Sequence, residues 1–166
     1  MKRPAIWFVN AAVRTIKAWV PWLARPDDEF ARTRLEPAEY RLYLSMDVRD
    51  RQHACQVASR LLDRRPDAGG ALVRAALLHD VGKAGAPYNP LYRMLSHLYA
   101  PRDVPSGPLY RGLRGAWQIR RHHHRYGAAM IRDAGGDRDV ADLVERHHQP
   151  NGDPDAELLK GLDDET

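Results

Sequence analysis

The sequence predicts an all-α fold, organised as one compact domain that an N-terminal amphipathic helix precedes. Apolar residues recur at steps of three and four along much of the chain, whereas no stretch keeps the period of two that predicts a strand. Asp and Pro residues stand where several helices would start. The 166 residues suffice for one core, and the single cysteine, Cys55, excludes an intrachain disulfide.

The first predicted helix occupies residues 5–24. Its apolar side chains form a stripe that three tryptophans flank. Arg14 and Lys17 interrupt the stretch, so its uncharged part is too short for a transmembrane segment, and no signal-peptide cleavage site follows. We therefore expect a cytoplasmic protein whose helix packs on the domain or on a second subunit of a homodimer. The alternative is peripheral contact of residues 5–24 with a membrane surface.

The next helices follow from their start and stop residues. Pro37 fits the first turn of a short helix over residues 37–46, and Asp47 precedes a longer one over 48–64. An apolar run predicts a helix over 71–78, with a stop at Gly82. Breaks rich in glycine or proline separate three later helices, over 121–134, 137–148 and 154–166. We assign residues 1–47 to a helical extension packing on the domain and residues 48–166 to the domain itself.

Residues 84–121 differ from their surroundings, because they contain five prolines and four glycines. This composition predicts a loop-rich excursion with one short helix near 91–99. Between Lys83 and Arg125 there are eight Lys or Arg residues and one acid, Asp103. Such charge suits an anionic partner such as a phosphate ester, although a solvated basic face has the same composition. Nucleic-acid binding is a weaker alternative, because no recognised motif accompanies the charge.

Histidine is the residue type that points to chemistry. Seven of the eight histidines form four clusters: His53, His79, residues 122–124 and residues 147–148. His79 and Asp80 end an almost uncharged run that must be buried, and a buried His–Asp pair is costly unless something neutralises it. A divalent cation does so, because imidazole and carboxylate are natural ligands. Any one of these histidines alone would more often be a hydrogen-bonded core residue, and only the clusters together favour a metal site.

Three segments resemble the motifs of the HD-domain superfamily. Leu77–Lys83 reads Leu-Leu-His-Asp-Val-Gly-Lys and resembles its H-D-x-G-K signature; residues 52–58 resemble its upstream histidine element, and residues 158–164 its closing aspartate element. The resemblance spans residues 48–166. It implies a helical metal-dependent phosphohydrolase whose first metal site is formed by His53, His79, Asp80 and Asp163.

Two further segments are similar to elements that supply a second ion in binuclear members. His123 to Gly127 resembles an H-x-x-x-G element, and Glu145 to His148 resembles a paired-histidine element. The implied second site comprises Asp80, His123, His147 and His148. Adjacent helical residues point about 100° apart, so residues 122–124 cannot all face one ion, and which of them is the ligand stays open. The Gly-Tyr-Pro motif of members that cleave cyclic-di-GMP is missing after His148.

The resemblance implies hydrolysis of a phosphate ester of a nucleotide or similar small substrate by metal-activated water. Mixed His and carboxylate ligands favour one or two ions of Mn, Fe, Ni, Co or Zn. We expect Asp80 and Lys83 to be catalytic, and Lys83, Arg121 and Arg125 to bind substrate, although Lys83 could instead only cap a helix. The alternatives are a cyclic nucleotide or dinucleotide phosphodiesterase and a non-catalytic nucleotide-binding sensor.

Overall fold

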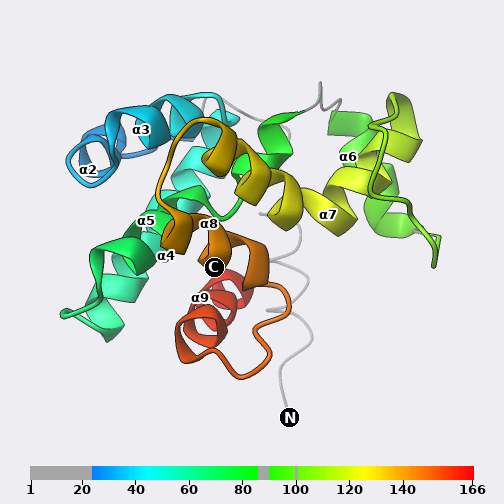
Figure 1. Cartoon of the computed structure of the whole chain (residues 1–166). Coiled ribbons are helices and arrows are strands. Elements are labelled where there is room, and N and C mark those ends of the chain that lie inside the picture. The colour runs from blue at the N-terminus through cyan, green and yellow to red at the C-terminus, as the bar shows by residue number, and fades with distance from the viewer. Residues whose placement is uncertain (1–23, 86–89, 100) are drawn as a thin grey trace, which may run out of the picture.

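The computed structural model describes residues 24–85, 90–99 and 101–166 (Figure 1). Over these ranges every regular element is helical and there is no strand, which confirms the predicted all-α class. The amphipathic helix predicted over residues 5–24 lies almost entirely outside the described residues. No helix of the described part is long and apolar enough to cross a membrane.

Two short helices, α2 (Asp28–Arg32) and α3 (Pro37–Leu44), begin the described chain. The Asp27 carboxylate accepts a hydrogen bond from the Phe30 amide, and Glu36 and Glu39 form a capping box at the start of α3. Ala31 and Tyr43 are fully buried in the same core as the later helices. Residues 24–47 therefore pack on the rest of the chain.

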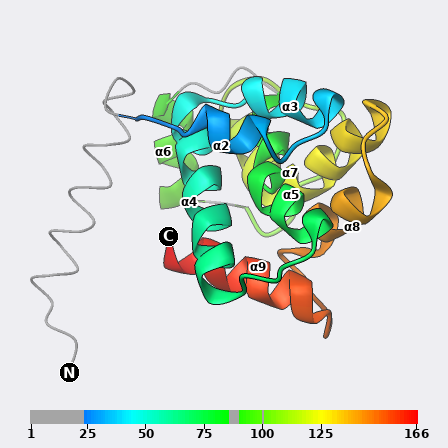
Figure 2. The ribbon, with the colours of Figure 1, turned by 90° about the vertical axis from the view of Figure 1, so that its left-hand side faces the viewer.

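The centre of the fold consists of four helices: α4 (Val48–Arg64), α5 (Gly70–Leu78), α8 (Arg138–Arg146) and α9 (Pro154–Glu165). Asp47, Asp137 and Asp153 cap α4, α8 and α9 through their carboxylates. Helix α5 packs between α4 and α8, and α9 lies across the end of α4 (Figure 2). The almost uncharged sequence of α5 reflects this position, because the helix is enclosed by its neighbours.

A 3₁₀ turn, η2 (Val81–Gly85), follows α5, and α6 (Pro90–Leu98) leads to α7 (Gly112–Asp133), the longest helix among the described residues. Helix α7 runs from α6 at one end of the molecule to α8 (Figure 1). The prediction that this helix starts at residue 121 was wrong by nine residues. Gly112 and Gly115 suggested a loop, but Gly115 instead permits close packing, since a Cβ there would lie 2.0 Å from the carbonyl oxygen of Tyr110.

Side chains of α7 hold the segment between α6 and α7 in place. Gln118 is buried; its Nε2 donates to the carbonyl oxygens of Pro105 and Pro108, at 3.0 and 2.9 Å, and its Oε1 accepts from the Tyr110 amide at 2.8 Å. The Tyr126 hydroxyl donates to the Ser106 carbonyl at 2.7 Å. Residues 101–111, which lie within the excursion predicted over 84–121, are thus fixed to α7 by their backbone; we call this segment the strap.

Candidate metal centre

His79 and Asp80 lie at the C-terminal end of α5, with only 0% and 2% of their surfaces exposed. His79 Nδ1 is 2.9 Å from the carbonyl oxygen of Ala76. A carbonyl only accepts, so Nδ1 carries a proton and Nε2 is the only nitrogen of this ring that can bind a cation. That Nε2 atom is buried and has no hydrogen-bond partner.

Two other histidines repeat this arrangement. His123 Nδ1 lies 3.0 Å from the Ile119 carbonyl oxygen, and His147 Nδ1 lies 2.6 Å from that of Val144. Each helix backbone therefore fixes the tautomer of its own histidine, as is usual for metal-binding imidazoles. His147 Nε2 is also buried without a hydrogen-bond partner. Such a lone pair is costly to bury unless a donor or a cation binds it.

A first group of possible ligands joins α4, α5 and α9. His53, His79 and Asp80 each offer one ligand atom, and these atoms lie within 4.8 Å of one another. Asp163 Oδ1 lies 2.8 Å from His53 Nε2 and 3.4 Å from His79 Nε2. Its neighbour Asp164 is exposed. All four residues of the predicted first site therefore gather in one place.

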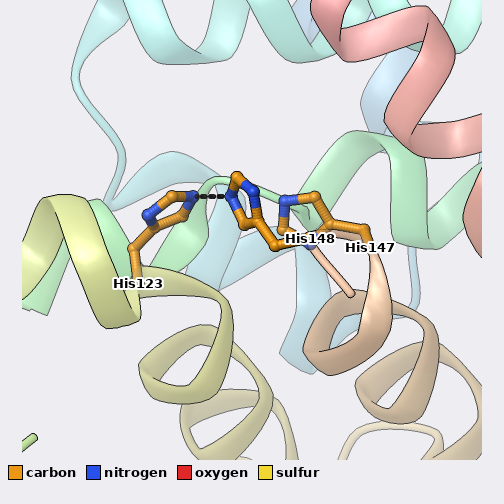
Figure 3. A group of neighbouring side chains, drawn as sticks. All are labelled: His123, His147 and His148. Carbon is orange, nitrogen blue, oxygen red and sulfur yellow. Dashed lines mark hydrogen bonds between the residues drawn. The ribbon is translucent and has the colours of Figure 1, made fainter. Parts of the chain in front are cut away.

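The second group is formed by His123 of α7 and by His147 and His148, which follow α8 (Figure 3). Their ligand atoms also lie within 4.8 Å of one another. The Nε2 atoms of His123 and His148 are 3.0 Å apart. The three consecutive histidines of α7 have different neighbours. Half-buried His122 has its Nε2 atom 2.7 Å from the Val104 carbonyl oxygen, whereas buried His124 lies beside the second group.

Asp80 stands between the two groups. Its Oδ2 lies 3.5 Å from His79 Nε2, and its Oδ1 lies 3.3 Å from His123 Nε2. The Lys83 ammonium is 2.5 Å from the same Oδ2. One carboxylate therefore faces both groups, while Lys83 supplies a positive charge beside it.

Two glycines bring the groups together. A Cβ on Gly82 would lie 1.9 Å from the carbonyl oxygen of His123 and 2.6 Å from the amide nitrogen of Gly127. The η2 turn, which carries the chain past Asp80, thus touches the backbone of α7 where His123 stands. Only glycine permits this approach without movement of one backbone.

These observations agree with a comparison of the sequence with protein families. A family model described as HD domain matches residues 51–164. The chain belongs to the HD-domain family. Comparisons with curated proteins and with solved structures gave no significant match.

As a family, HD-domain proteins are metal-dependent phosphohydrolases. The ligand atoms of the two groups, which together we call the HD site, fit a divalent cation. Nε2 atoms lie about 2.0–2.1 Å from a bound transition metal, so neighbouring ligand atoms stand only a few ångströms apart, as they do in both groups. The two buried Nε2 atoms that lack hydrogen-bond partners, those of His79 and His147, would each coordinate a bound cation. Which residues bind metal remains a prediction.

The protonation of the HD site also suits a cation. Burial lowers the pKa of His123 to about 3 and that of His147 to about 2, so both imidazoles are neutral near pH 7. Burial would lower the pKa of His79 too, but Asp80 and Asp163 outweigh it and raise that pKa to about 9. A cation that binds His79 must therefore displace a proton.

The carboxylates of the HD site remain ionised. Burial would raise the pKa of Asp80, but Lys83 and His79 outweigh it and hold the pKa well below its usual range. The pKa of Asp163 is likewise lowered, because the hydrogen bond with His53 and the nearby His79 imidazole outweigh its burial. The site thus offers two carboxylates in the charge state that binds metal.

A cavity of about 350 Å³ lies beside the second group, and His148 lines it. Of the two arginines predicted to bind substrate, Arg121 lines this cavity, whereas exposed Arg125 does not. Sequence reasoning missed Trp117 and His124 as parts of its wall. The sequence could have indicated them only by their helical spacing, since Trp117 lies four residues before Arg121 and His124 three residues after it, on the same face of α7. That spacing is informative only if the helix is known to start before Trp117.

Proposed function

We propose that this HD-domain protein hydrolyses a phosphate ester of a nucleotide or a similarly small phosphorylated substrate. The observation that carries the proposal is the position of Asp80, whose two oxygens face His79 on one side and His123 on the other, at 3.5 and 3.3 Å. One carboxylate shared by two ligand groups is the arrangement expected of a two-metal hydrolase.

The proposed ligand sets follow from the two groups. His53, His79, Asp80 and Asp163 would hold the first ion, and Asp80 with His123, His147 and His148 the second. Nitrogen ligands outnumber carboxylates, which favours Mn, Fe, Ni, Co or Zn over Mg. Such ions lower the pKa of bound water toward neutrality and offset charge on phosphoryl oxygens.

The protein's own cations would hold the rest of the substrate. Lys83 is part-buried next to Asp80, where its ammonium can offset negative charge that builds up on a phosphoryl group. Arg121 lies on the wall of the cavity, so its guanidinium can reach a second acceptor on the same substrate. Arg125, one turn along α7 and exposed, would contribute only at longer range.

The test is a metal-loaded activity screen over nucleoside monophosphates, sugar phosphates and cyclic nucleotides. Release of inorganic phosphate supports the proposed phosphohydrolase, whereas a ring-opened product with no phosphate release would indicate a phosphodiesterase. Asp163→Ala should abolish turnover, and Asp164→Ala, which alters the exposed neighbour, should not. Full metal occupancy without turnover on any substrate would contradict the proposal and favour a nucleotide-binding sensor.

A further inference from the structure

The cavity beside the second histidine group has the features of a binding site for one small molecule. At about 350 Å³ it lies near the lower end of the range of ligand sites, about 300–1,000 Å³. His148 belongs both to its wall and to the group with His123 and His147. A molecule in the cavity therefore borders the proposed metal centre directly.

Part of the cavity wall is formed by the strap, and hydrogen bonds hold the strap in place. Pro101 and Val104 of the strap line the cavity, and the Val104 carbonyl contacts His122 Nε2 at 2.7 Å. The neighbouring carbonyls of Pro105 and Pro108 are fixed by Gln118. Because backbone groups of the strap are anchored to α7, the cavity does not depend on a free loop.

Trp117 offers this cavity a flat carbon surface. Its only polar atom, Nε1, donates to the Tyr99 carbonyl at 2.6 Å, so it is already used. The indole ring is only partly buried and lines the cavity. Aromatic faces of this kind bind planar rings by stacking.

Arg121 offers a positive charge to the same space. It is exposed, lines the cavity, and makes no ion pair within the part of the chain that the structure describes. Its neighbour Arg120 differs, because its guanidinium donates to the Ser96 carbonyl. Among the described residues no Asp or Glu lines the cavity. An anion is therefore the natural partner for Arg121.

His124 adds a buried polar atom. Only 7% of this side chain is exposed, it lines the cavity, and its Nδ1 has no hydrogen-bond partner among the described residues. The wall thus combines the stacking face of Trp117, the cation of Arg121 and the mostly buried side chain of His124.

We infer, on the basis of the proposed function, that this cavity binds the leaving group of the substrate, and that this group carries a planar ring and a second anionic group. The ring stacks on Trp117, and Arg121 binds the anion. The scissile phosphate then lies toward His148 and the metal centre. The volume admits one ring system with its sugar.

Binding of a product-like probe tests this inference without turnover. The probe is adenosine 3′-phosphate, which has the ring and an anionic group but no 5′-phosphate; adenosine and inorganic phosphate each lack one feature. Affinities are measured by isothermal titration on the metal-loaded full chain, and chromatography verifies that the probe stays intact. We expect adenosine 3′-phosphate to bind about tenfold more tightly than adenosine.

Matched variants assign that affinity to residues. Arg121→Ala should remove the tenfold advantage of the 3′-phosphate, whereas Arg114→Ala, an exposed arginine of α7 outside the cavity, should keep it. Trp117→Leu should weaken binding of adenosine 3′-phosphate and of adenosine alike, by about tenfold. Trp117→Phe loses the same hydrogen bond to Tyr99 but keeps a ring, so it should retain most of the affinity.

Equal affinities in the Arg121 and Arg114 variants, or an affinity that Trp117→Leu leaves unchanged, would overturn the inference. Thermal unfolding of each variant verifies that the chain is folded. The outcome is separate from that of the activity screen. If no phosphate ester is hydrolysed, the proposed function fails, while the titration still decides whether the cavity binds a ring and an anion.

Discussion

Gly82 and Gly127 meet backbone to backbone at the centre of this fold. The Cβ that an alanine would place at position 127 lies 3.1 Å from the amide nitrogen of Gly82, and one placed at position 82 lies 2.6 Å from the amide nitrogen of Gly127. Gly82 follows Asp80 by two residues, and Gly127 follows His123 by one helical turn. The contact therefore sets how closely the two ligand groups approach.

Gly82→Ala should be strongly destabilising. The added Cβ would lie 1.9 Å from the His123 carbonyl oxygen, so the backbone must move. We expect a loss of about 3 kcal/mol or more, and a drop in Tm of roughly 10 °C. The matched control is Gly161→Ala in α9, where nothing lies within 4 Å of the new Cβ and a gain of about 0.5–1 kcal/mol is expected. Similar Tm values for the two variants would refute the close contact.

The second histidine group should account for one of two ions. Wild type, reconstituted with Mn and freed of excess metal, should hold about two ions per chain, and the His123→Ala, His147→Ala double variant about one. The reason is that the first group does not use either histidine. Elemental analysis gives both numbers. A saturated wild type with a single ion would limit the protein to the first group.

Lys83→Ala should damage turnover far more than metal binding. The ammonium lies 2.5 Å from Asp80 but is no metal ligand, so metal content should stay full. Loss of a cation that offsets phosphoryl charge costs roughly a hundredfold in kcat. If Lys83 only caps α5, the change costs about 0.3–1 kcal/mol of stability and leaves kcat near normal. Steady-state kinetics beside elemental analysis separates the two roles.

Gln118→Ala should loosen the strap. The change leaves the Pro105 and Pro108 carbonyls and the Tyr110 amide without their partner, a local loss of about 1–3 kcal/mol. Trypsin should then cut after Arg102 or Arg111 about tenfold faster, because cleavage follows the population of the open segment. As a control, trypsin should cut the Gln56→Ala variant, altered on the exposed face of α4, at the wild-type rate. Equal rates in both variants would show that Gln118 does not hold the strap.

The helices were predictable where local chemistry determines them. Asp47 and Pro37 mark the starts of α4 and α3 because a carboxylate cap and a fixed φ act within one turn. The start of α7 was not predictable in this way. Gly112 and Gly115 suggest a break, and only the close approach of the Tyr110 carbonyl, which precedes the helix, explains why a glycine stands at position 115 inside it.

The candidate site was predictable as a list of residues but not as an arrangement. The motifs around His53, His79 and Asp163 pointed to one site, and the chain brings these residues together. No motif revealed that Lys83 contacts Asp80, since the reach of a lysine depends on the tight 3₁₀ turn between them. The cavity wall was missed for a similar reason, because Trp117 and the strap meet only in three dimensions.

The metal content of Asp80→Ala beside wild type tests the central claim most directly. Asp80 faces both ligand groups, so its removal should strip the transition metal from the chain and remove the metal-induced rise in Tm. We predict about two ions per wild-type chain and close to none in the variant, measured by elemental analysis after the same reconstitution. Unchanged metal content in Asp80→Ala would contradict a metal centre built around this carboxylate.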